Sequence, residues 1–193
     1  FRFRESVASE ANPNPTPIIL ASDVTGSMGV LAETIIKTDL GVIMEELYDR
    51  QPVPNPQILC MATGDAYVDQ APIQVTQFES SIVLAQQMSK FWIEGGGGAN
   101  AGESYLLAWF FAAYKTKCDA IRKHKRKGYL FTIGDEAPLP TLTRDQIKKF
   151  LGMDAQADMD IHALLSHVQM DWEIFHLIVK PVVKLLSLPV IFL

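Results

Sequence analysis

Short apolar runs alternate with helical spacings along most of this 193-residue chain. Residues 18–22, 57–63 and 129–133 are apolar runs of strand length, and an aspartate follows soon after each of them. In residues 36–47 and 84–91 the apolar side chains recur instead at spacings of three or four, which is a helical periodicity. Strands that alternate with helices predict an α/β fold, with a doubly wound, mainly parallel central sheet and helices on both faces.

The remaining patterns extend this prediction. Residues 73–78 alternate apolar and polar side chains, as a half-exposed edge strand does. Residues 103–118 carry two interleaved apolar sets, which predicts a helix packed between the sheet and its neighbours. Thr143, with Gln146 three residues later, has the form of a capping box that opens a helix through Leu151. We also expect a helix over residues 161–168 and strands over residues 174–179 and 189–193.

The chain divides into a short polar segment and one domain. Residues 1–16 are polar and contain Asn12-Pro13-Asn14-Pro15, which predicts an arm or linker. Residues 17–193 are predicted to form a single domain. With 48% hydrophobic residues and a mean hydropathy of +0.12, the chain has enough apolar side chains for one substantial core.

Composition also narrows the classes of partner and location. The formal charge of −5 argues against nucleic acid as the main partner. The longest uncharged apolar run, residues 106–114, is far shorter than the ~20 residues that a membrane helix needs. The first residues lack the apolar centre of a signal peptide, and Cys60 and Cys118 lack metal-ligand spacing. We therefore expect reduced thiols in the core, no membrane partner and a cytoplasmic location.

Asp23, Thr25 and Ser27 follow the first apolar run at alternate positions, just before a helical pattern begins. Ligands of such sheets bind outside the carboxyl ends of the strands, where Asp65 and Asp135 also fall. Carboxylate and hydroxyl oxygens are hard ligands that suit Mg²⁺ or Mn²⁺. The sequence therefore predicts a metal site at this edge, with Asp65 nearby but not bound to the ion directly. The alternatives are that Thr25 and Ser27 only cap the next helix and that Asp65 only stabilises its own turn.

Asp23-Val24-Thr25-Gly26-Ser27 matches the pattern Asp-x-Ser/Thr-x-Ser, and the chain resembles the von Willebrand factor A (vWA) family on this ground. In that family the pattern belongs to the metal-ion-dependent adhesion site (MIDAS), and the resemblance extends over about residues 17–193. It implies a vWA-like domain in which Thr25 and Ser27 contact the metal. It also implies that Asp23 acts largely through water or hydrogen bonds and that Asp135 is the later aspartate of the site.

One position departs from the family pattern. Many vWA domains have Gly-Gly-Thr before the second helix, and Ala99 stands here where that threonine is expected. Alanine offers no ligand. Asn100 or Glu103 can substitute through a side-chain oxygen, or a water can fill the gap; otherwise the site is degenerate.

The resemblance implies a binding module rather than an enzyme. Its Mg²⁺ or Mn²⁺ keeps an open coordination position, which an acidic residue of a protein partner fills. Intracellular bacterial members of the family often serve AAA⁺ ATPases as substrate adaptors, and some occur in phage or defence gene sets. An AAA⁺ ATPase is therefore the partner class that the resemblance implies, and an intracellular bacterial or phage origin is its implied setting.

Two alternatives of other classes remain open: a metal-dependent phosphoester hydrolase, and an assembly protein whose metal site is idle. Hydrolases of the haloacid-dehalogenase type need a second aspartate where Thr25 stands. The glycine tract of residues 95–98 lacks the Lys-Ser/Thr of a P-loop, and the four histidines are scattered. We expect no catalytic residue. The basic run of residues 122–127 follows a helix and fits a solvated face, or else a contact for an acidic protein or nucleic acid.

Overall fold

The computed structural model describes residues 2–28, 30–35, 38, 40–95 and 102–179. Ala99, Asn100 and the strand predicted over residues 189–193 lie outside the described residues.

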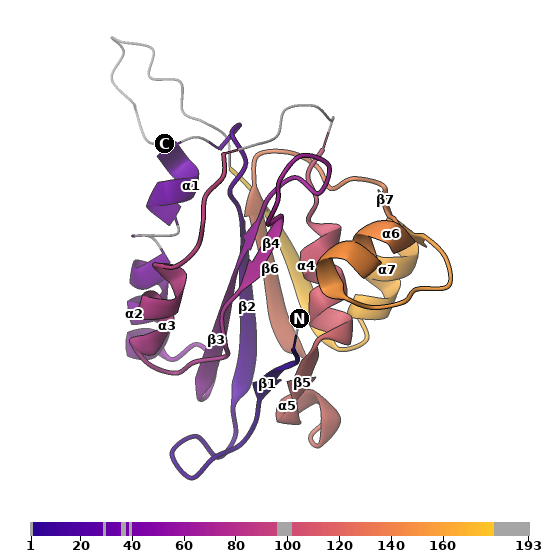
Figure 1. Cartoon of the computed structure of the whole chain (residues 1–193). Coiled ribbons are helices and arrows are strands. Elements are labelled where there is room, and N and C mark those ends of the chain that lie inside the picture. The colour runs from indigo at the N-terminus through magenta and orange to yellow at the C-terminus, as the bar shows by residue number, and fades with distance from the viewer. Residues whose placement is uncertain (1, 29, 36–37, 39, 96–101, 180–193) are drawn as a thin grey trace, which may run out of the picture.

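A five-stranded sheet forms the centre of the molecule (Figure 1). Its strands, from edge to edge, are β4 (Ile73–Val75), β3 (Pro56–Thr63), β2 (Thr16–Asp23), β6 (Gly128–Gly134) and β9 (Trp172–Ile178). All neighbours are parallel except β3 and β4, which are antiparallel. Every residue of β2 is buried, as the apolar composition of a central parallel strand requires. The predicted α/β class with a mainly parallel sheet is confirmed, and the predicted edge strand is the shorter β4.

Helices lie on both sides of this sheet (Figure 1). On one side are α1 (Val30–Thr34), α2 (Leu40–Arg50) and α3 (Val83–Met88). On the other are α4 (Leu106–Tyr114), α6 (Arg144–Gln146), the π-helical turn η2 (Ile147–Leu151) and α7 (Ile161–Val168). Two clusters of buried apolar side chains result. One joins α4, η2 and α7 to the sheet, and the other joins the sheet to α2 and α3.

The helix predicted over residues 103–118 is shorter than expected. As α4 it spans Leu106–Tyr114, with seven of its side chains buried, so its predicted position between sheet and neighbours is confirmed. Cys118 does not belong to it, because residues Thr116–Cys118 form a short strand, β5, before α5 (Asp119–Arg122). The prediction included Cys118 because its position continues the helical spacing of the apolar residues. A single apolar residue at the end of such a series fits a helix and a short strand equally well.

The polar N-terminal segment contains a strand. Residues Arg4–Ser6 form β1, which pairs in parallel with β5. The Arg4 Nε donates a hydrogen bond to the Thr76 carbonyl oxygen at 2.7 Å, and the Ala8 amide donates to Asp119 Oδ2 at 3.0 Å. Part of the segment predicted as an arm or linker is therefore bound to the domain by backbone and side-chain contacts.

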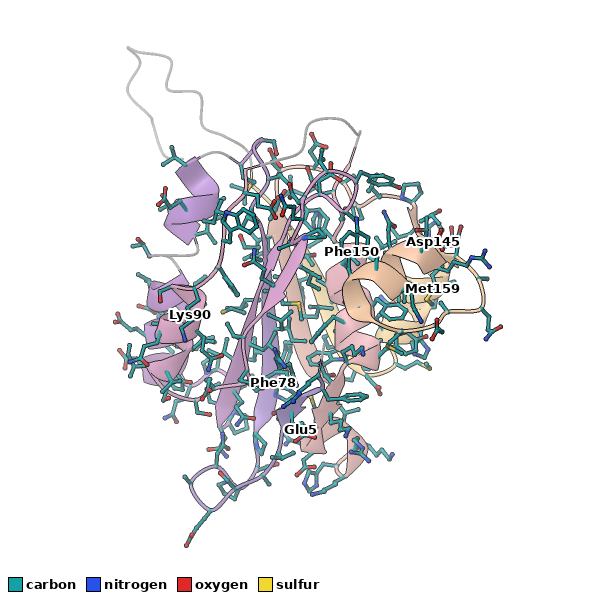
Figure 2. All side chains as sticks on the ribbon, viewed as in Figure 1. Glu5, Phe78, Lys90, Asp145, Phe150 and Met159 are labelled. Carbon is teal, nitrogen blue, oxygen red and sulfur yellow. The ribbon has the colours of Figure 1, made fainter. Side chains whose placement is uncertain are left out.

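The predicted capping box is confirmed at the start of α6. The Thr143 Oγ1 accepts from the Gln146 amide at 3.2 Å, and the Gln146 Oε1 accepts from the Thr143 amide at 3.1 Å. This segment lies between β7 (Thr141–Leu142) and β8 (Met159–Asp160), which form a small antiparallel sheet. Figure 2 shows Phe150 and Met159 in this outer layer, where both pack against the core that contains α4.

Both cysteines are buried and free, as predicted for core thiols. Burial raises the pKa of Cys60 and of Cys118 to about 12, so both thiols stay protonated at neutral pH. Among the described residues, no helix has the length and apolar character needed to span a bilayer.

Candidate metal centre

The carboxyl ends of three parallel strands meet at one edge of the sheet, the upper edge in Figure 1. Asp23 is the last residue of β2, and its register partner on β3 is Thr63. On the other side, Ser22 pairs with Ile133 of β6, which ends at Gly134. Asp65 and Asp135 follow these strand ends, so the sheet brings both to the edge that carries Asp23.

Asp23 is completely buried, and both of its carboxylate oxygens accept hydrogen bonds. The Thr25 amide donates to Oδ1 at 2.7 Å, and the Tyr105 hydroxyl donates to Oδ2 at 3.1 Å. Asp23 therefore fixes the turn that carries Thr25 and ties the end of β2 to the residue before α4. This geometry agrees with an aspartate that organises the site through hydrogen bonds.

The hydroxyls of Thr25 and Ser27 link two further carboxyl groups. Their oxygens lie 3.0 Å apart. The Ser27 Oγ donates to Asp135 Oδ1 at 3.2 Å, and the Thr25 Oγ1 donates to Glu103 Oε1 at 3.3 Å. Five of the six predicted site residues, namely Asp23, Thr25, Ser27, Glu103 and Asp135, are thus brought together, and the sixth, Asn100, lies outside the described residues.

These contacts contain too few hydrogens. Three oxygen–oxygen contacts join Glu103, Thr25, Ser27 and Asp135 in a row, but the two hydroxyls supply only two hydrogens. If both carboxyl groups are ionised, one contact brings two oxygens together without a hydrogen between them. A proton on Glu103 completes the row, because Glu103 then donates to Thr25, Thr25 donates to Ser27 and Ser27 donates to Asp135. A cation among the oxygens removes the same conflict.

Electrostatics favour the protonated form of Glu103. Burial, together with the negative charges of Asp23, Glu136 and Asp65, raises the pKa of this carboxyl to about 8. Burial is also the largest cause of the raised pKa of Asp23, with a contribution from the charge of Asp135. Among the described residues, no lysine or arginine forms an ion pair with Asp23, Glu103 or Asp135. Within the described part of the chain, the negative charge of these three carboxyl groups is therefore not balanced by an ion pair.

The donor set suits a hard divalent cation. Its atoms are carboxylate and hydroxyl oxygens, which match the preference of Mg²⁺ and Mn²⁺. Within the described ranges, no three His, Cys, Asp or Glu side chains are grouped closely enough to hold a metal by themselves. A cation at this edge therefore depends on the hydroxyls of Thr25 and Ser27 and on water for much of its coordination, as Mg²⁺ commonly does.

Asp65 lies at the edge of the sheet as predicted, and it also stabilises its own turn, which was the alternative. Its Oδ1 accepts from the Tyr67 amide at 2.8 Å, which is the local hydrogen bond of a turn aspartate. Its own amide donates to Asp69 Oδ2 at 2.8 Å, and the next amide, of Ala66, donates to Ser104 Oγ at 3.0 Å. This loop therefore packs beside Glu103 and raises its pKa through charge.

Two residues near the centre have no counterpart in the sequence prediction. Tyr105 is fully buried and binds Asp23, and its ring lies 4.9 Å from that of His176 on β9. The His176 Nε2 lies 3.2 Å from the carbonyl oxygen of Glu136, which can only accept, so the ring donates this hydrogen bond. His176 thus packs against Tyr105 and binds the loop that carries Asp135.

Stability should fall as the pH rises through the pKa of Glu103. The folded state keeps the proton up to about pH 8, whereas an ordinary glutamate loses it near 4.5, so the folded protein binds more protons in that interval. The contribution to stability is present below pH 4.5 and is lost as the pH rises towards 8. We expect Glu103→Gln to be more stable than the parent at pH 8, by on the order of 2 kcal/mol, and to lose much of the pH dependence.

Urea unfolding at pH 5 and pH 8 without divalent metal measures this difference. Glu45→Gln is the matched control, because Glu45 is exposed on α2 and is not among the carboxyl groups whose charge raises the pKa of Glu103. An equal pH dependence in the parent and in Glu103→Gln would show that this carboxyl ionises normally.

Neither a protein-family model nor a curated protein matches this chain. Solved structures do resemble it. Two structures of the pilus adhesin SpaC from Lactobacillus rhamnosus GG cover 72% of this chain, at 10% and 11% identity and TM-scores of 0.48 and 0.49. An aerotolerance-related membrane protein from Bacteroides fragilis covers 83% of it, at 12% identity and a TM-score of 0.45. This chain spans 17% of the adhesin and 66% of the Bacteroides protein. With TM-scores below 0.5, these similarities carry no argument about family or function.

Proposed function

We propose that this protein is a divalent-metal-dependent protein–protein interaction module, a doubly wound vWA-like domain with a MIDAS-type site. Mg²⁺ or Mn²⁺ binds at the carboxyl edge of β2, through the hydroxyls of Thr25 and Ser27. Asp23 and Asp135 support the ion directly or through water, and Glu103 supplies the oxygen that Ala99 lacks. The protein acts by association and has no catalytic residue.

The observation that carries this proposal is the row of oxygens from Glu103 through Thr25 and Ser27 to Asp135, beside the buried Asp23. Side chains from three separate parts of the chain converge there. Their negative charge has no lysine or arginine partner among the described residues, and a divalent cation would balance it. Thr25 and Ser27 are neutral, so a cation bound to them stays strongly electrophilic and favours an anionic ligand.

The proposed partner is a protein that offers an acidic residue. Its carboxylate completes the coordination of the ion and displaces a bound water. By analogy with vWA adaptors, an AAA⁺ ATPase is the partner class that we propose to examine first; the analogy rests on the sequence resemblance alone.

The experiment uses Mn²⁺ as the ion and a short aspartate-containing peptide as the partner carboxylate. Water-proton relaxation reports the waters on bound Mn²⁺. We expect the enhancement to appear on Mn²⁺ binding and to fall when the peptide is added, because its carboxylate replaces a water. The same peptide with asparagine should leave the signal unchanged, and EDTA should abolish it.

Ser27→Ala is the informative variant, because it removes one proposed ligand at an exposed position without disturbing the core. We expect weaker Mn²⁺ binding and an unchanged unfolding midpoint in EDTA. Absence of Mn²⁺ binding in the parent would favour the assembly protein with an idle site. Mn²⁺-stimulated hydrolysis of p-nitrophenyl phosphate that is lost in Asp23→Asn would favour the hydrolase.

A further inference from the structure

An apolar groove of about 320 Å³ lies on the sheet face that carries α2. One wall comes from α2 and the segment after it, and the other from β2, β6 and β9. None of the side chains that line it is charged. They are Ile18, Leu20, Ile43, Leu47, Pro52, Val53, Tyr129, Phe131, Ile133 and Leu177.

The groove continues onto β9, where large apolar side chains remain exposed. Phe175 is 45% exposed and stacks on Phe131 with ring centroids 4.9 Å apart, and Leu177 is 48% exposed. Trp172 and Ile174, on the other face of β9, pack in the core beneath α4 and α7. Because side chains alternate along a strand, β9 carries large apolar side chains on both faces, although Glu173 shares the face of Phe175 and Leu177; large apolar side chains on both faces are typical of a strand covered on both sides.

The segment that directly follows β9 has the composition and length to cover it. Val179 packs against the apolar cluster that borders the groove, and its amide donates to the Gly134 carbonyl oxygen at 2.7 Å. The next residues, 180–193, carry only Lys180 and Lys184 as charged residues and are otherwise mostly Val, Leu, Ile and Phe. They are twice as many as the seven residues of β9, so they can run back along its whole length.

We propose that residues 180–193 of this chain occupy the apolar groove and cover Phe175 and Leu177. Their attachment at Val179 gives them a high effective concentration at the groove, which a separate partner would lack. Burial of apolar surface on both sides supplies the driving force, at about 25 cal/mol per Å². This inference is independent of the metal site.

A chain that ends at Val179 tests the proposal. Compared with the full chain, we expect a lower unfolding midpoint and a several-fold rise in the fluorescence of the dye ANS, which binds exposed apolar surface. If the shortened chain does not fold, the test uses two substitutions in the 193-residue chain instead, alone and combined: Leu186→Ser and Leu177→Ser. Their effects on the unfolding midpoint should be less than additive, because the first substitution already weakens the contact that the second removes.

Val30→Ser is the matched control, because Val30 is 80% exposed on α1 and does not line the groove. It should change neither the midpoint nor the dye fluorescence. The proposal is overturned if the shortened chain matches the full chain in both measurements, or if the effects of Leu177→Ser and Leu186→Ser are additive. Dye binding that appears only on dilution of a dimer would assign the groove to a second copy.

Discussion

Gly134→Ala should destabilise the protein by about 3 kcal/mol, which is the upper end of the cost of overpacking a well-filled core. A Cβ added at Gly134 would lie 1.7 Å from the Tyr105 hydroxyl oxygen, 2.7 Å from its Cζ and 3.0 Å from the Asp23 Cβ. Tyr105 is fully buried and cannot swing away. The strand end must therefore shift, and the hydrogen bond between Tyr105 and Asp23 must lengthen or break. Urea unfolding, analysed with the m-value of the parent, measures the loss in the free energy of unfolding.

Gly41→Ala is the control for this substitution. Gly41 lies in α2, and an added Cβ would meet nothing within 4 Å. Because alanine favours the helix, we expect this variant to be as stable as the parent or up to about 1 kcal/mol more stable. Equal stabilities for the two alanine variants would mean that Tyr105 does not fill the space beside Gly134.

Asp23→Asn should weaken Mn²⁺ binding by about 10- to 100-fold, the usual loss when a group that orients metal ligands is altered. Asparagine has nearly the shape of aspartate, and its Oδ1 can still accept from the Thr25 amide. The variant nevertheless removes a buried negative charge beside the proposed ligands. Calorimetric titration at pH 8 measures the affinity, and the unfolding midpoint in EDTA shows whether the fold is retained.

Asp145→Asn is the matched control for charge, because it removes one carboxylate from the exposed outer layer that Figure 2 shows far from the sheet edge. Its Mn²⁺ affinity should equal that of the parent. An affinity in Asp23→Asn as high as in Asp145→Asn would contradict the assignment of the metal to the end of β2.

The sequence predicts the sheet better than the connections. Strands β2 and β3 are buried on both faces and β6 is half-buried on one of them, so their residues form continuous apolar runs whose ends are visible in the sequence. The capping box of α6 is equally local. By contrast, β1 and β5 have three residues each and stabilise one another across most of the chain, so neither carries a pattern of its own.

The same distinction holds at the candidate site. Asp23, Thr25 and Ser27 are recognisable because they follow one another at the end of one strand. The contact of Tyr105 with Asp23 joins residues 82 positions apart, so no local sequence pattern predicts it. Likewise, the raised pKa of Glu103 depends on its burial and on charges from three other segments, so only the folded arrangement reveals it.

The position of β2 has a consequence for synthesis on the ribosome. It is the first strand of the central sheet to emerge, yet it lies in the middle, between β3 and β6. Asp23 cannot gain Tyr105, nor Ser27 gain Asp135, until translation has passed those later residues. The oxygens that we assign to the metal therefore assemble only once most of the domain has been made, and a nascent chain interrupted before Asp135 lacks the complete site.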